Sequence, residues 1–413
     1  MNADQAYNKI YKLGFCAVAL FLPFGQPAIN YSVALLALLF LIPIDFSKKK
    51  ANRTLLFLPL FFYMIHAIGL LYSNNISYGL LDMETKFSYL LFPLIFFLKP
   101  PPADFFRTIK LFFVTGCFVI CLYNMTTSIN EYFITKNIDS FYYIAFSKVM
   151  HVQYLTIYLN ISILFILEIL LTESISRTLR LLGLLLVIFL LVNVSLLSSR
   201  LATVVSYMTI ILFIVLKAKG NQVLIKYWAY VLFTLALVIV TDYFVLSHSN
   251  RFDQVEILFN GNNDFYKFDK KEYNSATVRI PLWINAAQVI DDNKLLGVGT
   301  GDIKEELDSV YRKNKFAYAE ASHFSPHNQI LHTGIILGFV GITILLSMLL
   351  IPLYYSIRYK SYLLMCFIII FFFNMMTESI LERQAGIILF SFFYVILIAE
   401  LYEDIKKAGD LTD

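Results

Sequence analysis

Long apolar runs follow one another along almost the whole of this chain. An α-helix needs about 20 mostly apolar residues to cross the hydrocarbon core of a bilayer. Runs that reach or approach this length lie near 11–25, 27–45, 54–72, 86–99, 108–127, 151–172, 178–197, 200–217, 227–246, 329–356, 361–380 and 384–402. The pattern predicts an all-α integral membrane protein with about 12 transmembrane helices.

The composition supports a lipid environment. Of the 413 residues, 59% are hydrophobic and 15% are charged, whereas soluble domains are nearer half apolar and a quarter charged. These proportions exclude a soluble enzyme and a secreted disulfide scaffold. The net charge of +4 is small and gives no indication of a nucleic-acid partner. The four cysteines all fall inside apolar runs, at spacings that match neither a zinc site nor a disulfide framework.

The basic residues predict the orientation of the chain. With the N-terminus in the cytoplasm, 18 Lys and Arg residues fall at cytoplasmic ends and five in the short outer loops. The positive-inside rule therefore predicts that both termini are cytoplasmic and that the number of spans is even. The first run continues directly into the second without a small-residue cleavage site, so we expect it to be retained.

One long polar segment interrupts the apolar pattern between the ninth and tenth runs. It covers residues 247–327 and holds 22 charged residues. We expect an extracytoplasmic (periplasmic) loop here, between a membrane part at 1–246 and a second one with the cytoplasmic tail at 328–413. Helical spacing after Trp283 predicts a short amphipathic helix over about 280–291, and the glycines of 297–301 predict a turn.

Two arginines are placed by this topology at the outer membrane boundary. Arg200 follows two serines, which are natural N-caps, and opens the eighth run. Arg279 lies in the long loop just before Pro281, which suits the first turn of a helix. Each could be an ordinary interfacial or loop cation. Alternatively, the two guanidinium groups could bind a phosphate.

A histidine stands at the same level. In Ser325-Pro326-His327-Asn328 the serine and proline predict a helix start, which would place His327 in the first turn of the tenth span. The positive end of the helix dipole disfavours an imidazolium there, and a neutral imidazole can act as a general base. Gly334, Gly338 and Gly341 should let a neighbouring helix approach closely. An interfacial helix cap is the alternative interpretation of His327.

Three further charged residues lie near the outer ends of spans. Glu378 and Glu382 flank the turn between the last two runs and could share a helix face, and Lys86 opens the fourth run. A solvated turn is the plainer interpretation of all three. No Asp-x-Asp sequence or Cys/His cluster of ligand spacing indicates a metal site, so we expect neither a metal nor another cofactor.

These motifs resemble those of the O-antigen ligase family. Ser325-Pro326-His327-Asn328 with the glycines that follow is similar to its histidine–glycine signature, and Gly341 is followed by Ile342 where the family often has a second glycine. The stretch from Arg279 through Trp283 to Gly299 resembles the family's long-loop motif, and Arg200 resembles its first arginine. The twelve spans with one large outer loop are also similar, and imply a GT-C-like fold.

The resemblance implies a glycosyltransferase of the bacterial inner membrane whose active site faces the periplasm. Its donor would be a glycan on undecaprenyl pyrophosphate, and its acceptor lipid A–core or another glycan or protein. His327 would be the catalytic base, with Arg200 and Arg279 on the pyrophosphate. Lys86, Glu378 and Trp283 are further candidates for the site. Direct attack by an acceptor hydroxyl would invert the anomeric carbon.

Other functions remain open at this stage. Polymerases of glycan repeat units and protein O-oligosaccharyltransferases share the same signature. A transporter or flippase would need ionisable residues at mid-membrane depth, whereas Glu168 and Asp242 lie near the ends of runs. The chain also lacks the strong internal repeat found in many transporters. A non-catalytic scaffold would leave two arginines and a histidine at one level unexplained.

Overall fold

The computed structural model describes residues 3–42, 54–218, 236 and 278–409, and every regular element in these ranges is a helix. Eleven of the twelve apolar runs correspond to helices, and the run near 227–246 lies outside the described residues apart from position 236. Six described helices are long and apolar enough to cross a membrane. They are α6 (Phe106–Thr135), α8 (Val152–Thr172), α9 (Arg177–Leu197), α10 (Arg200–Ala218), α17 (Gln329–Arg358) and α19 (Gln384–Lys407). The protein is therefore an α-helical integral membrane protein, and the twelve-span count stays a prediction.

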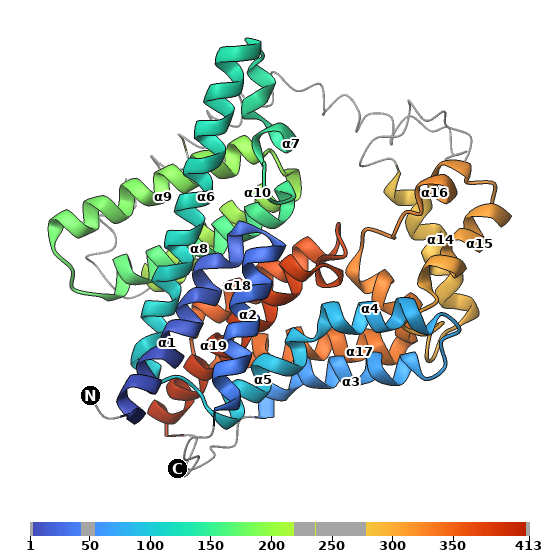
Figure 1. Ribbon diagram of the computed structural model, residues 1–413, viewed down its shortest axis with the longest axis horizontal. Coiled ribbons are helices and arrows are strands. Elements are labelled where there is room, and N and C mark those ends of the chain that lie inside the picture. Colours follow the sequence, from blue (N-terminus) through green and yellow to red (C-terminus); the bar gives the residue numbers. More distant parts are fainter. Residues whose placement is uncertain (1–2, 43–53, 219–235, 237–277, 410–413) are drawn as a thin grey trace.

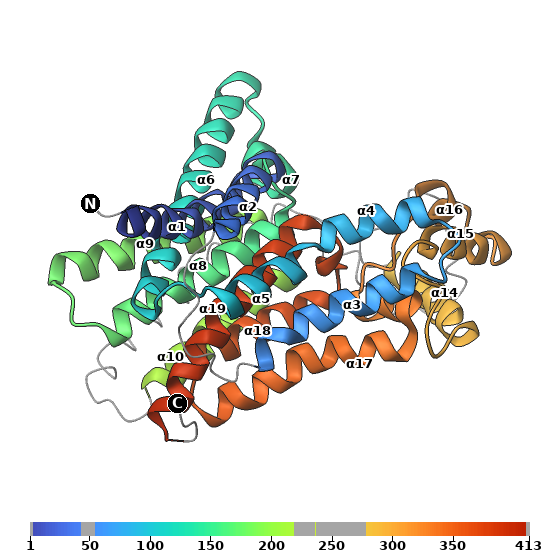
Figure 2. The ribbon, with the colours of Figure 1, turned by 60° about the horizontal axis from the view of Figure 1, so that its bottom comes forward.

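The helices differ in how far the protein itself covers them. The apolar window of α19 is 89% buried and that of α8 is 72% buried, against 33% for α9. A helix that is apolar on all sides can be buried in this way, because no polar face needs water. Figures 1 and 2 show α19 passing through the middle of the bundle and α9 at its edge. Of the shorter apolar helices, α18 (Tyr362–Met375) packs on α10, α17 and α19, and α2 (Gln26–Leu41) packs on α1 (Ala3–Phe21).

The fourth apolar run is longer and more broken than its sequence suggests. After α3 (Leu58–Leu70), the chain forms α4 (Ile76–Lys86) and then α5 (Ser88–Leu98), with Phe87 between them. The apolar helix α5 begins two residues after Lys86, and Lys86 itself ends a separate helix, α4, that was not expected. Asn75 caps the start of α4, because its side chain accepts a hydrogen bond from the Tyr78 N–H at 3.0 Å. Lys86 ends a helix and lies inside the protein.

The described part of the long polar segment forms three helices, α14 (Arg279–Asp292), α15 (Ile303–Lys313) and α16 (Ala317–Ser322). Residues 247–277 lie outside the described residues. A small core separate from that of the bundle holds the three helices together and includes Leu282, Leu307 and Tyr311. Figure 1 shows this group beside the ends of α3 and α4. The expected helix at 280–291 corresponds to α14.

Glycines join this outer group to α17. Gly338 interrupts α17 with φ 60°, and a Cβ there would lie 2.4 Å from the carbonyl carbon of Leu295. Backbone N–H groups of Val298 and Gly299 donate to carbonyls of α17 at 2.8 and 3.0 Å. The expected approach of a neighbouring helix holds for Gly334 alone, which faces α14. Gly338 admits the backbone of residues 294–299 instead, because only glycine adopts this φ without strain.

Candidate active site

A cavity of about 370 Å³ lies where the bundle meets the outer helices, a volume suited to a small ligand or part of a larger one. Six segments line it: α7 (Tyr143–Phe146), the start of α8, the α9–α10 junction, the start of α14, α16 with the stretch after it, and the turn after α18. The lining residues are Tyr143, His151, Val152, Gln153, Ser198, Ser199, Arg200, Leu201, Val278, Arg279, Tyr318, Phe324, His327, Thr377 and Glu378. Arg200, Arg279, His327 and Glu378 thus border one cavity.

A sharp junction between two helices places Arg200. Ser198 ends α9 in the left-handed conformation, at φ 49°, and its hydroxyl donates to the carbonyl of Ser195 at 3.1 Å. The Ser199 carbonyl accepts the first hydrogen bond of α10, from the N–H of Thr203 at 2.8 Å. Ser198 therefore closes the preceding helix, which differs from the expectation that both serines cap the next one. The turn brings Arg200, the first residue of α10, to the cavity.

Arg279 begins α14 and borders the cavity from the outer group of helices. Its Nε is buried and has no hydrogen-bond partner among the residues that the structure describes. Burial lowers the pKa of Arg279, and the nearby charge of Glu378 opposes this effect. A guanidinium stays protonated at any physiological pH. The cavity wall therefore carries a positive group with an N–H left for an anion.

His327 lies just before α17 and not in its first turn, as expected from the sequence. The reason is Asn328, whose side chain accepts hydrogen bonds from the N–H groups of Ile330 and Leu331 at 2.9 and 3.1 Å and so caps the helix. His327 has φ 46°, a left-handed conformation that turns it out of the helix. Trp283 does not line the cavity; its Nε1 donates to the carbonyl of Pro326 at 3.0 Å and holds this turn.

A carboxylate contacts the histidine. The Nδ1 atom of His327 lies 3.1 and 3.2 Å from the two carboxylate oxygens of Glu378. Burial raises the pKa of Glu378, but the hydrogen bond with His327 and the charges of His327, His151 and Arg279 outweigh it, and the pKa ends below 4.5. An ionised carboxylate on Nδ1 favours the tautomer with its proton on Nδ1. The other ring nitrogen, Nε2, is then free to accept a proton.

A second histidine at the cavity was missed in the sequence. His151 precedes the first residue of α8 and lines the same cavity. Burial lowers its pKa, with Glu378 acting in the opposite direction. The criterion that selected Arg200, an ionisable residue at the outer start of an apolar run, would also have selected His151. Its contribution to the cavity follows from α8 packing beside α10.

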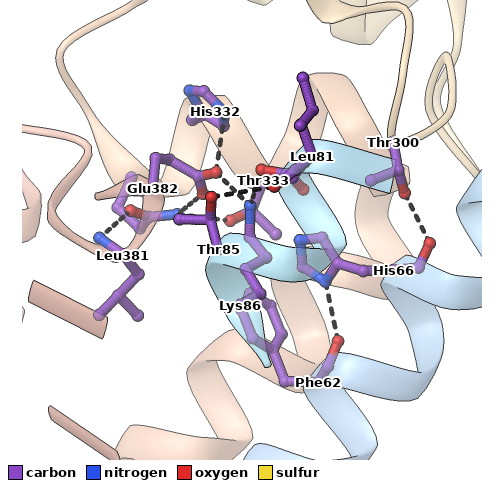
Figure 3. Close-up of polar contacts among 12 residues, drawn as sticks. Phe62, His66, Leu81, Thr85, Lys86, Thr300, His332, Thr333, Leu381 and Glu382 are labelled. Carbon is purple, nitrogen blue, oxygen red and sulfur yellow. Dashed lines mark hydrogen bonds and ion pairs between the residues drawn. The ribbon is translucent and has the colours of Figure 1, made fainter. Parts of the chain in front are cut away.

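Lys86 and Glu382 do not line this cavity but form a separate buried cluster (Figure 3). The Lys86 side chain is 0% exposed and bridges Asp82, at 2.5 Å, and Glu382. Glu382 also accepts a hydrogen bond from Gln329 Nε2 at 2.6 Å and lies 3.3 Å from His332 Nε2. The structure therefore places Lys86 and Glu382 apart from the cavity that Glu378 borders, and a role of Lys86 in the site stays a prediction.

The charges on the cavity wall favour an anionic ligand. Two arginines face it, against the single carboxylate of Glu378, and the two histidines add neutral hydrogen-bonding groups. Within the described ranges, no group of three or more His, Cys, Asp or Glu residues could hold a metal ion. The arrangement can bind a phosphate-bearing molecule and remove a proton from a second one.

Comparison with known proteins gives one family. Residues 184–346 match the family described as O-antigen ligase, a segment that includes Arg200, Arg279 and His327, while Glu378 lies beyond it. No curated protein matches the chain. The matched segment carries both arginines of the cavity and His327, whereas His151 lies before it. Over residues 184–346, the chain is therefore similar to the O-antigen ligase family.

Proposed function

We propose that this protein transfers a glycan from undecaprenyl pyrophosphate to the lipid A–core of lipopolysaccharide. The observation that carries this proposal is one cavity bordered by two arginines and a histidine–carboxylate pair. The similarity of residues 184–346 to the O-antigen ligase family supports a lipid-linked glycan donor. The reaction would take place at the outer, periplasmic face of the bacterial inner membrane, with both chain termini in the cytoplasm.

The arginines would act on the leaving group. As the bond between the anomeric carbon and the pyrophosphate oxygen breaks, negative charge grows on the pyrophosphate. Arg200 and Arg279 can stabilise that charge with planar, two-pronged hydrogen bonds. The partly buried position of Arg279 strengthens the interaction, since less water screens it. This supply of positive charge makes the proposed transfer independent of a divalent metal.

His327 would act on the acceptor. An acceptor hydroxyl oxygen attacks the anomeric carbon, its proton passes to Nε2 of His327, and undecaprenyl pyrophosphate leaves. Attack opposite the leaving group inverts the anomeric configuration. Glu378 holds Nδ1 and stabilises the imidazolium that forms, the role that a carboxylate beside a catalytic histidine commonly has.

The test is transfer by the purified full-length protein in lipid nanodiscs. It is supplied with a glycan on undecaprenyl pyrophosphate and, in separate reactions, with lipid A–core, with a second lipid-linked repeat unit and with an unfolded protein. We expect transfer to lipid A–core, with an inverted linkage, undiminished by a chelator. Transfer only to the repeat unit or to protein would identify a polymerase or a protein glycosyltransferase. Movement of intact donor across the bilayer without transfer would identify a flippase.

A further inference from the structure

A second cavity of about 380 Å³ adjoins the first, and His151 lines both. It lies between the turn that joins α1 to α2, the segment before α8, and the start of α19. Its lining residues are Leu22, Phe24, Gly25, Gln26, Pro27, Ile29, Val149, Met150, His151, Tyr154, Arg383 and Ala385. All three segments are outer ends of spans in the predicted topology, so the second cavity opens at the same membrane level as the first.

The second cavity combines apolar walls with one cation. Arg383 follows η5 (Ile380–Glu382), is exposed, and has no ion-pair or hydrogen-bond partner of its side chain in the described part of the chain. Tyr154 also lines the cavity; it is 2% exposed, and its hydroxyl has no hydrogen-bond partner there. Most other lining side chains, such as Phe24 and Met150, are apolar. This is the surface that an amphiphile with an anionic headgroup fits.

We propose that this second cavity binds the acceptor and that its ligand is a phosphorylated, acylated lipid. Arg383 binds a phosphate of the acceptor headgroup, and the apolar walls contact the chains nearest to it. His151 forms the border across which the acceptor sugar reaches the first cavity. The inference rests on the proposed function, because it assigns the second substrate of that same reaction.

The acceptor fits this position better than the donor does. The first cavity already offers two arginines to a pyrophosphate, so the donor needs no third cation in a separate cavity. Inverting attack brings the acceptor oxygen to the side of the anomeric carbon opposite the pyrophosphate. A second cavity joined to the first through His151 provides such an approach, and its apolar wall keeps the acceptor's acyl chains at the level of the membrane helices α1 and α2.

The experiment pairs a charge change in the protein with a charge change in the lipid. Arg383→Gln and the wild-type chain are assayed with lipid A–core and with the same lipid after enzymatic removal of its phosphates. With the phosphorylated lipid, the variant should raise the acceptor KM about tenfold, the effect of losing one hydrogen-bonded charge pair, and leave kcat and donor binding unchanged. With the dephosphorylated lipid, the variant and the wild type should have the same raised KM.

Two further variants control the interpretation. Arg312→Gln removes an exposed arginine of α15 that pairs with Glu320 and should change no parameter. Val149→Trp adds bulk at a partly exposed wall residue and should raise the KM of both lipids by filling the cavity. Equal effects of Arg383→Gln on both lipids, or a loss of donor binding, would overturn the proposal.

Lipid binding that is measured without glycan transfer distinguishes a failure of this proposal from a failure of the proposed function. Binding of phosphorylated lipid A to the full-length protein is measured in the absence of donor. If binding depends on Arg383 but no glycan reaches lipid A–core, the second cavity stands and the proposed transfer fails. If glycan reaches lipid A–core and Arg383→Gln alters neither binding nor KM, the transfer stands and the second cavity fails.

Discussion

Glu378 and Glu382 lie one helical turn apart in sequence, and each contacts a histidine near the start of α17. Glu378 contacts His327 at the wall of the first cavity, where the other charged groups are the two arginines. Glu382 meets His332 inside the protein, where Lys86 and Gln329 also bind it. Two glutamates within five residues therefore have different surroundings, one at the wall of the cavity and one inside the protein.

The surroundings of the two glutamates differ in whether a polar group is left to bind a substrate. Both carboxylate oxygens of Glu382 have partners, and the lysine between Asp82 and Glu382 is wholly buried, which favours a structural role for this cluster. The side chain of Gln329 also accepts from the Leu381 N–H at 2.7 Å and so fixes the turn after α18 to α17. Around Glu378 the ring of His327 keeps one nitrogen for a substrate. The buried cluster therefore fixes the turn after α18, and this turn places Glu378 at the wall of the first cavity.

Substitution of the histidine at the cavity should have the largest effect on activity. His327→Ala removes the proposed base, so transfer should fall by roughly a hundred- to ten-thousand-fold, with donor binding largely intact. Single-turnover transfer and donor binding are measured separately. His323→Ala is the matched control, because His323 pairs with Asp308 in the outer group and away from the cavity. Near-normal transfer by His327→Ala would remove His327 from the mechanism.

Substitution of the buried lysine should act on folding instead. Lys86→Met leaves Asp82 and Glu382 without their shared cation, and breaking such a buried pair costs about 3–5 kcal/mol of stability. Lys148→Met, which breaks a partly exposed pair with Glu131, should cost about 1 kcal/mol or less. Thermal unfolding of both variants in the same detergent gives the comparison. Equal losses of stability would contradict the structural role of the buried cluster.

Neutralising Glu378 should change the pH dependence of transfer. Burial alone would raise the pKa of Glu378, but its hydrogen bond with His327 and the nearby positive charges lower it, so its carboxylate keeps its charge into the acidic range. The contribution of Glu378 to transfer should be lost only as the pH falls through that lowered pKa, and Glu378→Gln should remove this part of the acidic limb of the pH–rate profile. The maximal rate should fall by about ten- to a hundredfold as the ring loses its orientation. An unmoved limb would show that Glu378 does not act on the base, and Glu320→Gln in α16 serves as control.

A smaller effect on transfer is expected when a substitution of Arg279 keeps its positive charge. Arg279→Lys should lower transfer by about tenfold or less, and Arg279→Gln by more, because a lysine supplies the charge without the planar pair of N–H groups. Both variants should also weaken donor binding, since the pyrophosphate contacts Arg279 before and during the reaction. Titration with undecaprenyl pyrophosphate measures this. Equal binding by the two variants would mean that charge at position 279 is unimportant.

Much of the membrane architecture could be predicted from the sequence, because a span has a length and composition that few other elements share. Eleven of the twelve runs correspond to helices, and Arg200, Arg279 and His327 border one cavity. Helix starts were less predictable. Asn328 caps α17 where Ser325 was expected to, and Asn75 starts α4 before Lys86, because several residues of one segment could act as the cap.

The partners of charged residues could not be predicted. The sequence spacing of Glu378 and Glu382 suggests a shared face, yet the chain between them is not a regular α-helix and their side chains reach different neighbours. Lys86 is separated from Glu382 by almost three hundred residues, so nothing local indicates their contact. His151 was missed for a similar reason, since its place at the cavity depends on how α8 packs.

The most direct test of this account is a double-mutant cycle between His327 and Glu378, with single-turnover transfer as the readout. If Glu378 acts through His327, it has no function once the imidazole is gone. His327→Ala combined with Glu378→Gln should therefore be no slower than His327→Ala alone. If the double variant is slower by the full factor that Glu378→Gln causes in the wild-type chain, the two residues act independently. Glu378 would then not act through His327, and the proposed histidine–carboxylate pair would be contradicted.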